Sequence, residues 1–195
     1  MNVRFAALAG ALSLAAAAFA QTETPRGTAS ATVGGKKVTM DYGRPALKGR
    51  SIDELTKQLP EDRIWRAGEN QVTTLTTEGD ILVGGTRVAA GKYSVYVHAP
   101  ATGEWSLAIN GDQGVPLGKI WDKAPANLKD EPWPHLEGYQ KSIGAKEVAR
   151  ATMRSGKAGS AAELFTIDLK PAGDGATMTL SWGDRSWSLD VKPAK

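Results

Sequence analysis

The sequence predicts an all-β protein, an antiparallel β-sandwich of about ten strands, jelly-roll-like or similar, with one short helix. Polar and apolar residues alternate with a period of two through most of the chain, which is typical of half-buried strands. Turn-forming Gly, Asp and Pro residues separate these segments at intervals of about 8–12 residues. The connections are too short for the crossover helices that parallel strands require, so antiparallel pairing is expected.

Two glycine pairs predict tight hairpins. Residues 37–42 alternate polar and apolar side chains, and Gly34-Gly35 precedes them. Paired glycines accept the positive φ angles of the two-residue turns that join antiparallel strands. Gly84-Gly85 repeats this pattern between two further short strands. The remaining strands are expected at residues 72–77, 92–99, 105–110, 148–154, 164–170, 176–182 and 185–191.

The segments between the strands carry their own signals. Ser51 and Glu54 form a capping-box pattern that begins a helix of about two turns, which Pro60 ends. Residues 111–143, rich in Gly, Pro and Lys, are expected to form a long surface excursion and not another layer. Gly183-Asp184 is expected to turn the chain between the last two strands, and residues 156–162 to form a flexible loop tip.

Residues 1–20 are predicted to be a secretory signal peptide. Arg4 is followed by an apolar stretch that ends in Ala18-Phe19-Ala20, the small-x-small pattern of a cleavage site. This stretch is shorter than the roughly 20 apolar residues that cross a bilayer, so no membrane span is expected after cleavage. The mature chain is expected in the periplasm or the medium, with residues 21–27 as a disordered lead-in and residues 28–195 as a single β-sandwich domain.

Composition excludes several kinds of chemistry. The chain has no Cys, which excludes a disulfide scaffold, a Cys-ligated zinc site and a thiol nucleophile. Its 24 Lys plus Arg and 21 Asp plus Glu leave a formal net charge of +3, so a nucleic-acid partner is not indicated. His98 and His135 are its two histidines, and the sequence contains no P-loop or HExxH motif. We therefore expect no metal site and no cofactor.

The densest polar cluster lies in residues 44–70. Four cations, a tryptophan and an asparagine are the candidate ligand-binding residues: Arg44, Lys48, Arg50, Trp65, Arg66 and Asn70. Arginine binds carboxylate and phosphate groups through paired hydrogen bonds, and an indole supplies an apolar wall. The cluster indicates a pocket for a small polar or anionic ligand or a glycan. The alternative is a structural corner, in which Arg44 or Arg66 pairs with Asp41, Asp53 or Glu69 and donates hydrogen bonds to loop carbonyls.

Tryptophan is frequent in this chain, which holds six. Trp65, Trp105 and Trp182 lie in or beside strand patterns and are expected in the core. The other three are candidates for an exposed aromatic surface, which would suit stacking on sugar rings or contact with a partner: Trp121, Trp133 and Trp187.

The chain resembles a bacterial family called domain of unknown function 2911 across about residues 38–190. The resemblance is carried by ordered motifs, YGRPALKGR at 42–50, WRAGENQVT at 65–73, AGKYSV at 90–95, WSLAIN at 105–110 and ELFTI at 163–167. It implies an exported β-rich domain. Where the family pattern has Ala and Glu around the asparagine, this chain has Glu69 and Gln71, so the family's acidic position is not acidic here.

Three classes of function fit these observations. A non-catalytic exported binding module that uses the cluster at residues 44–66 is favoured. A hydrolase acting on envelope or extracellular polymers is the alternative, with Asp41 and Glu69 as its candidate catalytic carboxylates, because a glycosidase needs two acidic groups about 5–10 Å apart in space. A structural or partner-binding envelope protein is the third class. No oligomeric state is indicated.

Overall fold

The computed structural model describes residues 24–195. The predicted signal peptide and residues 21–23 of the predicted lead-in lie outside the described residues. The last two lead-in residues, Arg26 and Gly27, begin the first strand, because the chain pairs with its neighbour from Arg26 onward. None of the helices in residues 24–195 is long and apolar enough to cross a membrane.

The larger sheet has seven strands, and every pair in it is antiparallel. In spatial order it contains β1 (Arg26–Val33), β2 (Lys36–Gly43), β4 (Thr73–Thr77), β7 (Gly91–His98), β8 (Ser106–Asn110) and β11 (Glu147–Thr152), with β3 (Ile64–Trp65) paired to the end of β7. Short connections join β1 to β2 and β7 to β8, whereas residues 44–72, 78–90 and 111–146 separate the other neighbours along this order.

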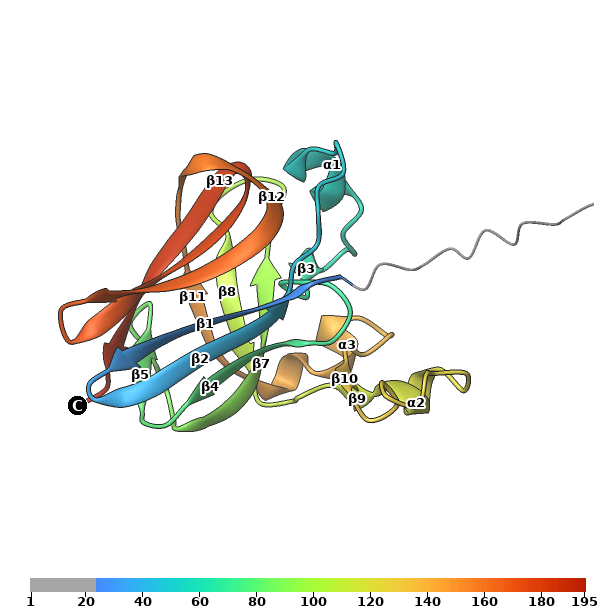
Figure 1. The fold of residues 1–195 in the computed structure, drawn as a ribbon, viewed down its shortest axis with the longest axis horizontal. Coiled ribbons are helices and arrows are strands. Elements are labelled where there is room, and N and C mark those ends of the chain that lie inside the picture. The colour runs from blue at the N-terminus through green and yellow to red at the C-terminus, as the bar shows by residue number, and fades with distance from the viewer. Residues whose placement is uncertain (1–23) are drawn as a thin grey trace, which may run out of the picture.

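The second sheet has four strands, in the order β12 (Arg154–Ala172), β13 (Gly175–Pro193), β5 (Ile81–Val83) and β6 (Thr86–Val88). Figure 1 shows the long β12–β13 hairpin lying across β1 and β2 of the larger sheet. The smaller elements are α1 (Ile52–Lys57), β9 (Val115–Pro116), α2 (Leu117–Ile120), β10 (Pro132–Trp133), α3 (Tyr139–Ser142) and the 3-10 turn Gly144–Lys146. The predicted all-β antiparallel sandwich is confirmed.

The main core lies between the two sheets. Met40 and Tyr42 point inward from β2, and Phe165 and Ile167 point inward from β12. The Tyr42 hydroxyl donates a hydrogen bond of 2.9 Å to the carbonyl of Ile167, so a polar tip is satisfied inside an otherwise apolar layer. Buried and half-buried residues alternate at 38–42 of β2 and at 164–169 of β12, which is the period-two pattern that the sequence carries.

Both predicted glycine hairpins are confirmed. The turn between β1 and β2 has φ of 56° at Gly34 and 78° at Gly35, and the turn between β5 and β6 has φ of 56° at Gly84 and 92° at Gly85. A side chain at Gly34 would also meet Pro193, 2.6 Å from the added Cβ. The sequence predicts these turns because their signal is local.

The predicted turn at Gly183-Asp184 is wrong, because β13 runs through both residues without a break. Gly183 adopts φ of 60° and pairs with Ala162, at a place where the register with β12 shifts. The glycine therefore bends a continuous strand at a bulge and does not end it. The predicted loop tip at residues 156–162 is also wrong, since this segment forms the part of β12 opposite the bend.

The tryptophans divide differently from the expectation. Trp187 is buried and stacks on Trp105, with ring centroids 4.2 Å apart and planes 8° from parallel. Trp121 is exposed over 49% of its surface, and Trp133 is half-buried. Trp187 was a candidate for the surface, but its alternation within β13 places it on the inward face.

Residues 111–143 cover part of the outer face of the larger sheet through a second, small apolar cluster. Tyr139 packs edge-on against Tyr96 of β7, with centroids 4.7 Å apart. The fully buried Asn110 donates to the Tyr139 hydroxyl at 3.0 Å and to the Ile143 carbonyl at 2.8 Å. Burial raises the pKa of Tyr139 above its ordinary value, so this hydroxyl stays protonated and donates to Glu147.

Asp112 anchors the start of this excursion. Its carboxylate accepts hydrogen bonds from the Gly114 amide at 2.9 Å and from Lys146 Nζ at 2.7 Å, and His135 Nε2 lies 2.9 Å from it. Burial of the carboxyl group raises its pKa, but the hydrogen bonds from Lys146, His135 and Gly114 outweigh burial and lower the pKa of Asp112 to about 2.

We expect Asp112→Asn to lower the melting temperature at pH 7. The pKa of Asp112 is lower in the folded than in the unfolded chain, so the ionised carboxylate stabilises the fold above about pH 4 and this contribution is lost as pH falls toward about 2. Thermal unfolding followed by circular dichroism should show the gap between wild type and variant closing over that interval. Asp168→Asn, which alters an exposed carboxylate 3.7 Å from Lys170 Nζ, is the control. A gap that stays constant from pH 7 to pH 2 would contradict this role.

Candidate functional site

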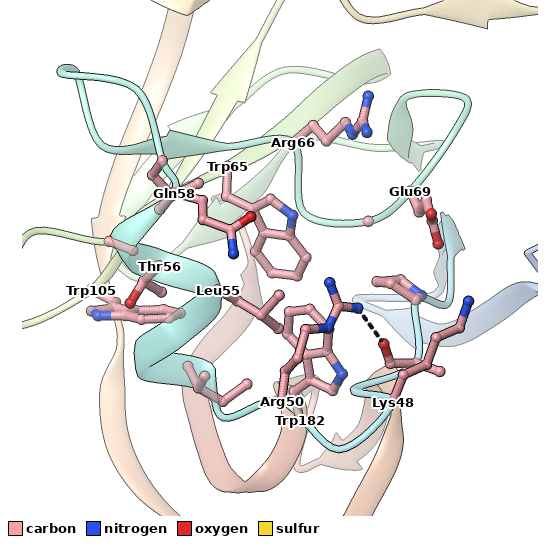
Figure 2. A pocket seen from close by; sticks show the side chains of 16 residues that line it. Lys48, Arg50, Leu55, Thr56, Gln58, Trp65, Arg66, Glu69, Trp105 and Trp182 are labelled. Atoms are coloured by element: carbon pink, nitrogen blue, oxygen red, sulfur yellow. Dashed lines mark hydrogen bonds between the residues drawn. The ribbon is translucent and has the colours of Figure 1, made fainter.

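A cavity of about 290 Å³ lies at the end of the sandwich where α1 and β3 meet β13. Figure 2 shows its walls, with α1 on one side, the loop that carries Lys48 on another, and indole rings between them. The lining comes from segments far apart in the sequence: Pro45, Ala46, Lys48, Arg50, Ile52, Leu55, Thr56, Gln58, Leu59, Trp65, Arg66, Gly68, Glu69, Ala99, Trp105 and Trp182.

Stacked aromatic rings form the inner wall of the cavity. Trp65 of β3 lies nearly parallel to Trp182 of β13, with centroids 5.2 Å apart and planes 11° from parallel. Phe165 of β12 packs edge-on against Trp65 at 4.8 Å and against Trp182 at 5.9 Å. Phe165 is fully buried, so the cavity wall is continuous with the core and the two indoles have little freedom to move.

The α1 helix forms the opposite wall. Its capping box is confirmed, because the Ser51 hydroxyl accepts from the Glu54 amide at 3.2 Å and the Glu54 carboxylate accepts from the Ser51 amide at 2.7 Å. Arg63 then holds the helix to the sheet, donating to the Thr56 carbonyl at 2.7 Å and to the Ala99 carbonyl at 3.0 Å. Sequence reasoning missed Arg63, since binding to distant carbonyls leaves no local pattern.

Arg50 is held by the backbone of its own loop. Its Nε donates to the Leu47 carbonyl at 2.9 Å and its Nη2 to the Ala46 carbonyl at 3.2 Å. The loop is in turn fixed to β12, because the amide of Lys48 donates to the Glu163 carboxylate at 2.7 Å. Figure 2 shows one of these two hydrogen bonds as a dashed line. The cation is therefore positioned before any ligand arrives.

The loop after β3 is held by a very close approach of two backbone segments. A Cβ atom at Gly43 would lie 2.1 Å from the Glu69 carbonyl oxygen, and one at Gly68 would lie 3.1 Å from the Gly43 carbonyl oxygen. Ala67 and Asn70 adopt left-handed φ of 50° and 64°, which costs about 1–2 kcal/mol for a residue such as Ala67. The Thr73 hydroxyl, 2.7 Å from the Ala67 carbonyl, helps to hold this conformation.

The structure brings four of the six predicted ligand-binding residues to the cavity, together with Glu69: Lys48, Arg50, Trp65 and Arg66. Arg66 projects from the rim, away from the Trp65 ring in Figure 2. Among residues 24–195, the side chains of Lys48 and Arg66 make no hydrogen bond and no ion pair. Glu69 accepts a hydrogen bond of 2.6 Å from the Thr24 hydroxyl. Three cations and one carboxylate thus belong to the lining of the cavity.

Three predicted residues lie outside the lining. Arg44 points to β12 and donates to the Phe165 carbonyl at 3.3 Å and to the Thr166 hydroxyl at 3.2 Å, which is a structural corner. Asp41 forms an ion pair with Arg26 and does not line the cavity. Asn70 adopts a left-handed φ of 64° in the loop after β3 and does not line the cavity.

Trp182 contributes a feature that the sequence did not indicate. Its ring is 7% exposed, and its indole Nε1 has no hydrogen-bond partner in the part of the chain that the structure describes. The sequence places Trp182 in a strand and predicts a core residue, but it does not show that β13 brings this ring beside Trp65. The described residues hold no cluster of three or more His, Cys, Asp and Glu side chains that could bind a metal ion.

Fold and site together define a class, an antiparallel β-sandwich protein with a small aromatic-walled cavity at one end. Within that class the chain belongs to the family described as Protein of unknown function (DUF2911), whose profile matches residues 24–191. The family resemblance of the sequence motifs is thereby confirmed, and the family description assigns no ligand or reaction. No curated protein and no solved structure matched the chain.

Gly43→Ala should destabilise the protein by about 1–3 kcal/mol, because the added methyl group overlaps the Glu69 backbone. Urea unfolding measures the loss. Gly159→Ala is the matched control, since a Cβ there has no neighbour within 4 Å, and we expect it to stay within about 0.5 kcal/mol of wild type. Equal stability of Gly43→Ala and wild type would show that the two loops do not pack as described.

The two arginines at either end of the cluster should also respond differently to truncation. Arg44→Ala removes hydrogen bonds to β12 and should lower the free energy of unfolding by about 1–2 kcal/mol. Arg66→Ala removes an exposed side chain and should change it by less than about 0.5 kcal/mol. Chemical denaturation of both variants without ligand tests this, and the reverse order would overturn the assignment of Arg44 to a structural corner.

Proposed function

We propose that this chain is an exported, non-catalytic binding protein that takes a small anionic ligand in the cavity beside Arg50. The observation that carries the proposal is the geometry of Arg50. Two backbone carbonyls fix its guanidinium at the cavity, and it forms no ion pair within residues 24–195. Its remaining N–H groups are available to a ligand, with the Lys48 side chain close by on the same rim.

A fixed guanidinium favours an anion for two reasons. Little side-chain entropy is lost on binding, because the loop backbone has already ordered Arg50. Hydrogen bonds between a charged donor and a carboxylate or phosphate are also about twice as strong as neutral ones. The three cations around the cavity outnumber Glu69, the one carboxylate among its described lining residues, so the local charge favours the same kind of ligand.

The size of the cavity favours a small molecule over a polymer. A volume of about 290 Å³ is near the lower end of the roughly 300–1,000 Å³ that ligand pockets span. A monosaccharide-sized group or a small organic acid fits this space, whereas a glycan chain would have to extend into solvent.

The hydrolase alternative has less support. Glycoside hydrolysis uses two carboxyl groups on either side of the bond that breaks. Glu69 lines the cavity, but Asp41 is paired with Arg26 and lies outside the lining, so the two carboxylates do not share it. The predicted signal peptide supports export, which would place this binding activity in the periplasm or the medium.

A thermal-shift panel of acetate, glucuronate, 3-phenylpropionate and inorganic phosphate tests the proposal. At least one anion should raise the melting temperature of the wild-type protein, because a ligand that binds the native state stabilises it. Arg50→Ala and Lys48→Gln should each weaken that binding about tenfold or more.

Arg87→Ala is the control, because Arg87 is an exposed arginine of β6 that pairs with Asp80 away from the cavity. It should keep the full thermal shift. Lys48→Gln keeps the experiment decisive if Arg50→Ala unfolds, since the Lys48 side chain holds no part of the loop. If no anion stabilises the protein, or if Arg87→Ala loses the effect equally, the proposal fails.

A further inference from the structure

The indole nitrogen of Trp182 is a buried donor without an acceptor. Trp182 is only 7% exposed, and no described residue accepts a hydrogen bond from its Nε1. Folded proteins pair nearly all such groups, because burying a donor away from water without a partner is costly. Trp182 lines the cavity, so a ligand that displaces the atoms now covering Nε1 would supply the missing acceptor.

The position of this nitrogen gives the cavity a polar end. In Figure 2 the nitrogen of Trp182 lies on the side of the ring that faces Lys48, away from Leu55. Arg50 lines the same cavity as this ring. An indole N–H donates and never accepts, and a guanidinium does the same, so the group that satisfies both is an acceptor with two oxygens.

The other end of the cavity is apolar. Leu55 of α1 and Leu59, just beyond its end, line the cavity, and Trp65 and Trp105 complete this end. A hydrated sugar would leave several hydroxyl groups unpaired against these side chains, which disfavours binding. A hydrocarbon ring or short chain would instead exchange water for apolar contact.

We infer that the ligand is a small amphiphilic carboxylate. Its carboxylate lies between Arg50 and the Trp182 indole N–H, and its apolar ring or chain lies against Trp65 and Leu55. This inference rests on the proposed function, since it names the ligand class for the same cavity.

Isothermal titration with three probes tests the ligand class. The probes are 3-phenylpropionate, which has both a ring and a carboxylate, 3-phenyl-1-propanol, which lacks the charge, and glucuronate, which lacks the apolar part. We expect 3-phenylpropionate to bind about tenfold or more tightly than either of the others, because each of them loses one end of the cavity.

Trp182→Phe tests the hydrogen bond, because phenylalanine keeps an aromatic ring but has no N–H. It should weaken 3-phenylpropionate binding by about fivefold to tenfold, because the carboxylate loses one donor. Trp133→Phe, outside the cavity lining, is the control and should bind as wild type does. Circular dichroism checks that both variants fold.

A second measurement follows ligand binding to the wild-type protein, so it does not depend on a variant that still binds the ligand. In a ¹⁵N-labelled protein, the Trp182 indole N–H resonance should move downfield when 3-phenylpropionate is added, as a donor gains a charged acceptor. Its assignment comes from the resonance that is missing in Trp182→Phe. An indole resonance that does not respond to bound 3-phenylpropionate overturns the inferred hydrogen bond.

The outcomes separate the two proposals. If glucuronate binds as tightly as 3-phenylpropionate, and binding needs Arg50 but not the Trp182 N–H, the amphiphilic ligand class is wrong and the anion-binding function stands. If 3-phenyl-1-propanol binds as tightly as the acid, neither stands, because the charge then contributes nothing. If none of the three probes binds, the amphiphilic ligand class is also overturned.

Discussion

Edge-to-face packing around Phe165 joins the two sheets and supports the two indole rings that line the cavity. This one ring contacts Tyr42 of the larger sheet, Trp65 of β3 and Trp182 of the second sheet. The core and the site therefore share a wall. Any change that moves Phe165 alters the stacking of Trp65 on Trp182, so the shape of the cavity depends on the packing of the sandwich.

The backbone carbonyl groups around each arginine of the cationic cluster determine what that arginine does. Arg44 and Arg63 donate to carbonyl groups that tie the cluster to β12 and to the sheet, so they serve the fold. Arg50 is also held by carbonyl groups, but its loop directs the rest of the guanidinium to the cavity. Residues of the same type within one stretch of chain thus divide between structure and the proposed binding site. The division follows from which neighbours each side chain meets in space.

Local signals in the sequence predicted local structure well. The Gly34-Gly35 turn and the Ser51 capping box are confirmed because each depends on residues within a few positions of one another. The prediction was wrong where the conformation of a residue depends on a partner far away in the sequence. Gly183 looks like a turn residue, but its pairing with Ala162 across the hairpin makes it a bend inside a continuous strand.

The candidate site follows the same rule. Lys48, Arg50 and Trp65 were predicted from their density along the chain, and they line one cavity. The contribution of Trp182 could not be predicted, because only the fold of β13 brings that indole beside β3. Asp41 and Glu69 were the two candidate carboxylates, yet Asp41 forms an ion pair with Arg26 outside the cavity.

A crystal structure of the protein with 3-phenylpropionate would show whether the ligand lies where we propose. We expect its carboxylate within hydrogen-bond distance of both the Arg50 guanidinium and Trp182 Nε1, with the phenyl ring against Trp65. A carboxylate bound elsewhere on the protein, with the Arg50 side of the cavity holding only solvent, would contradict it.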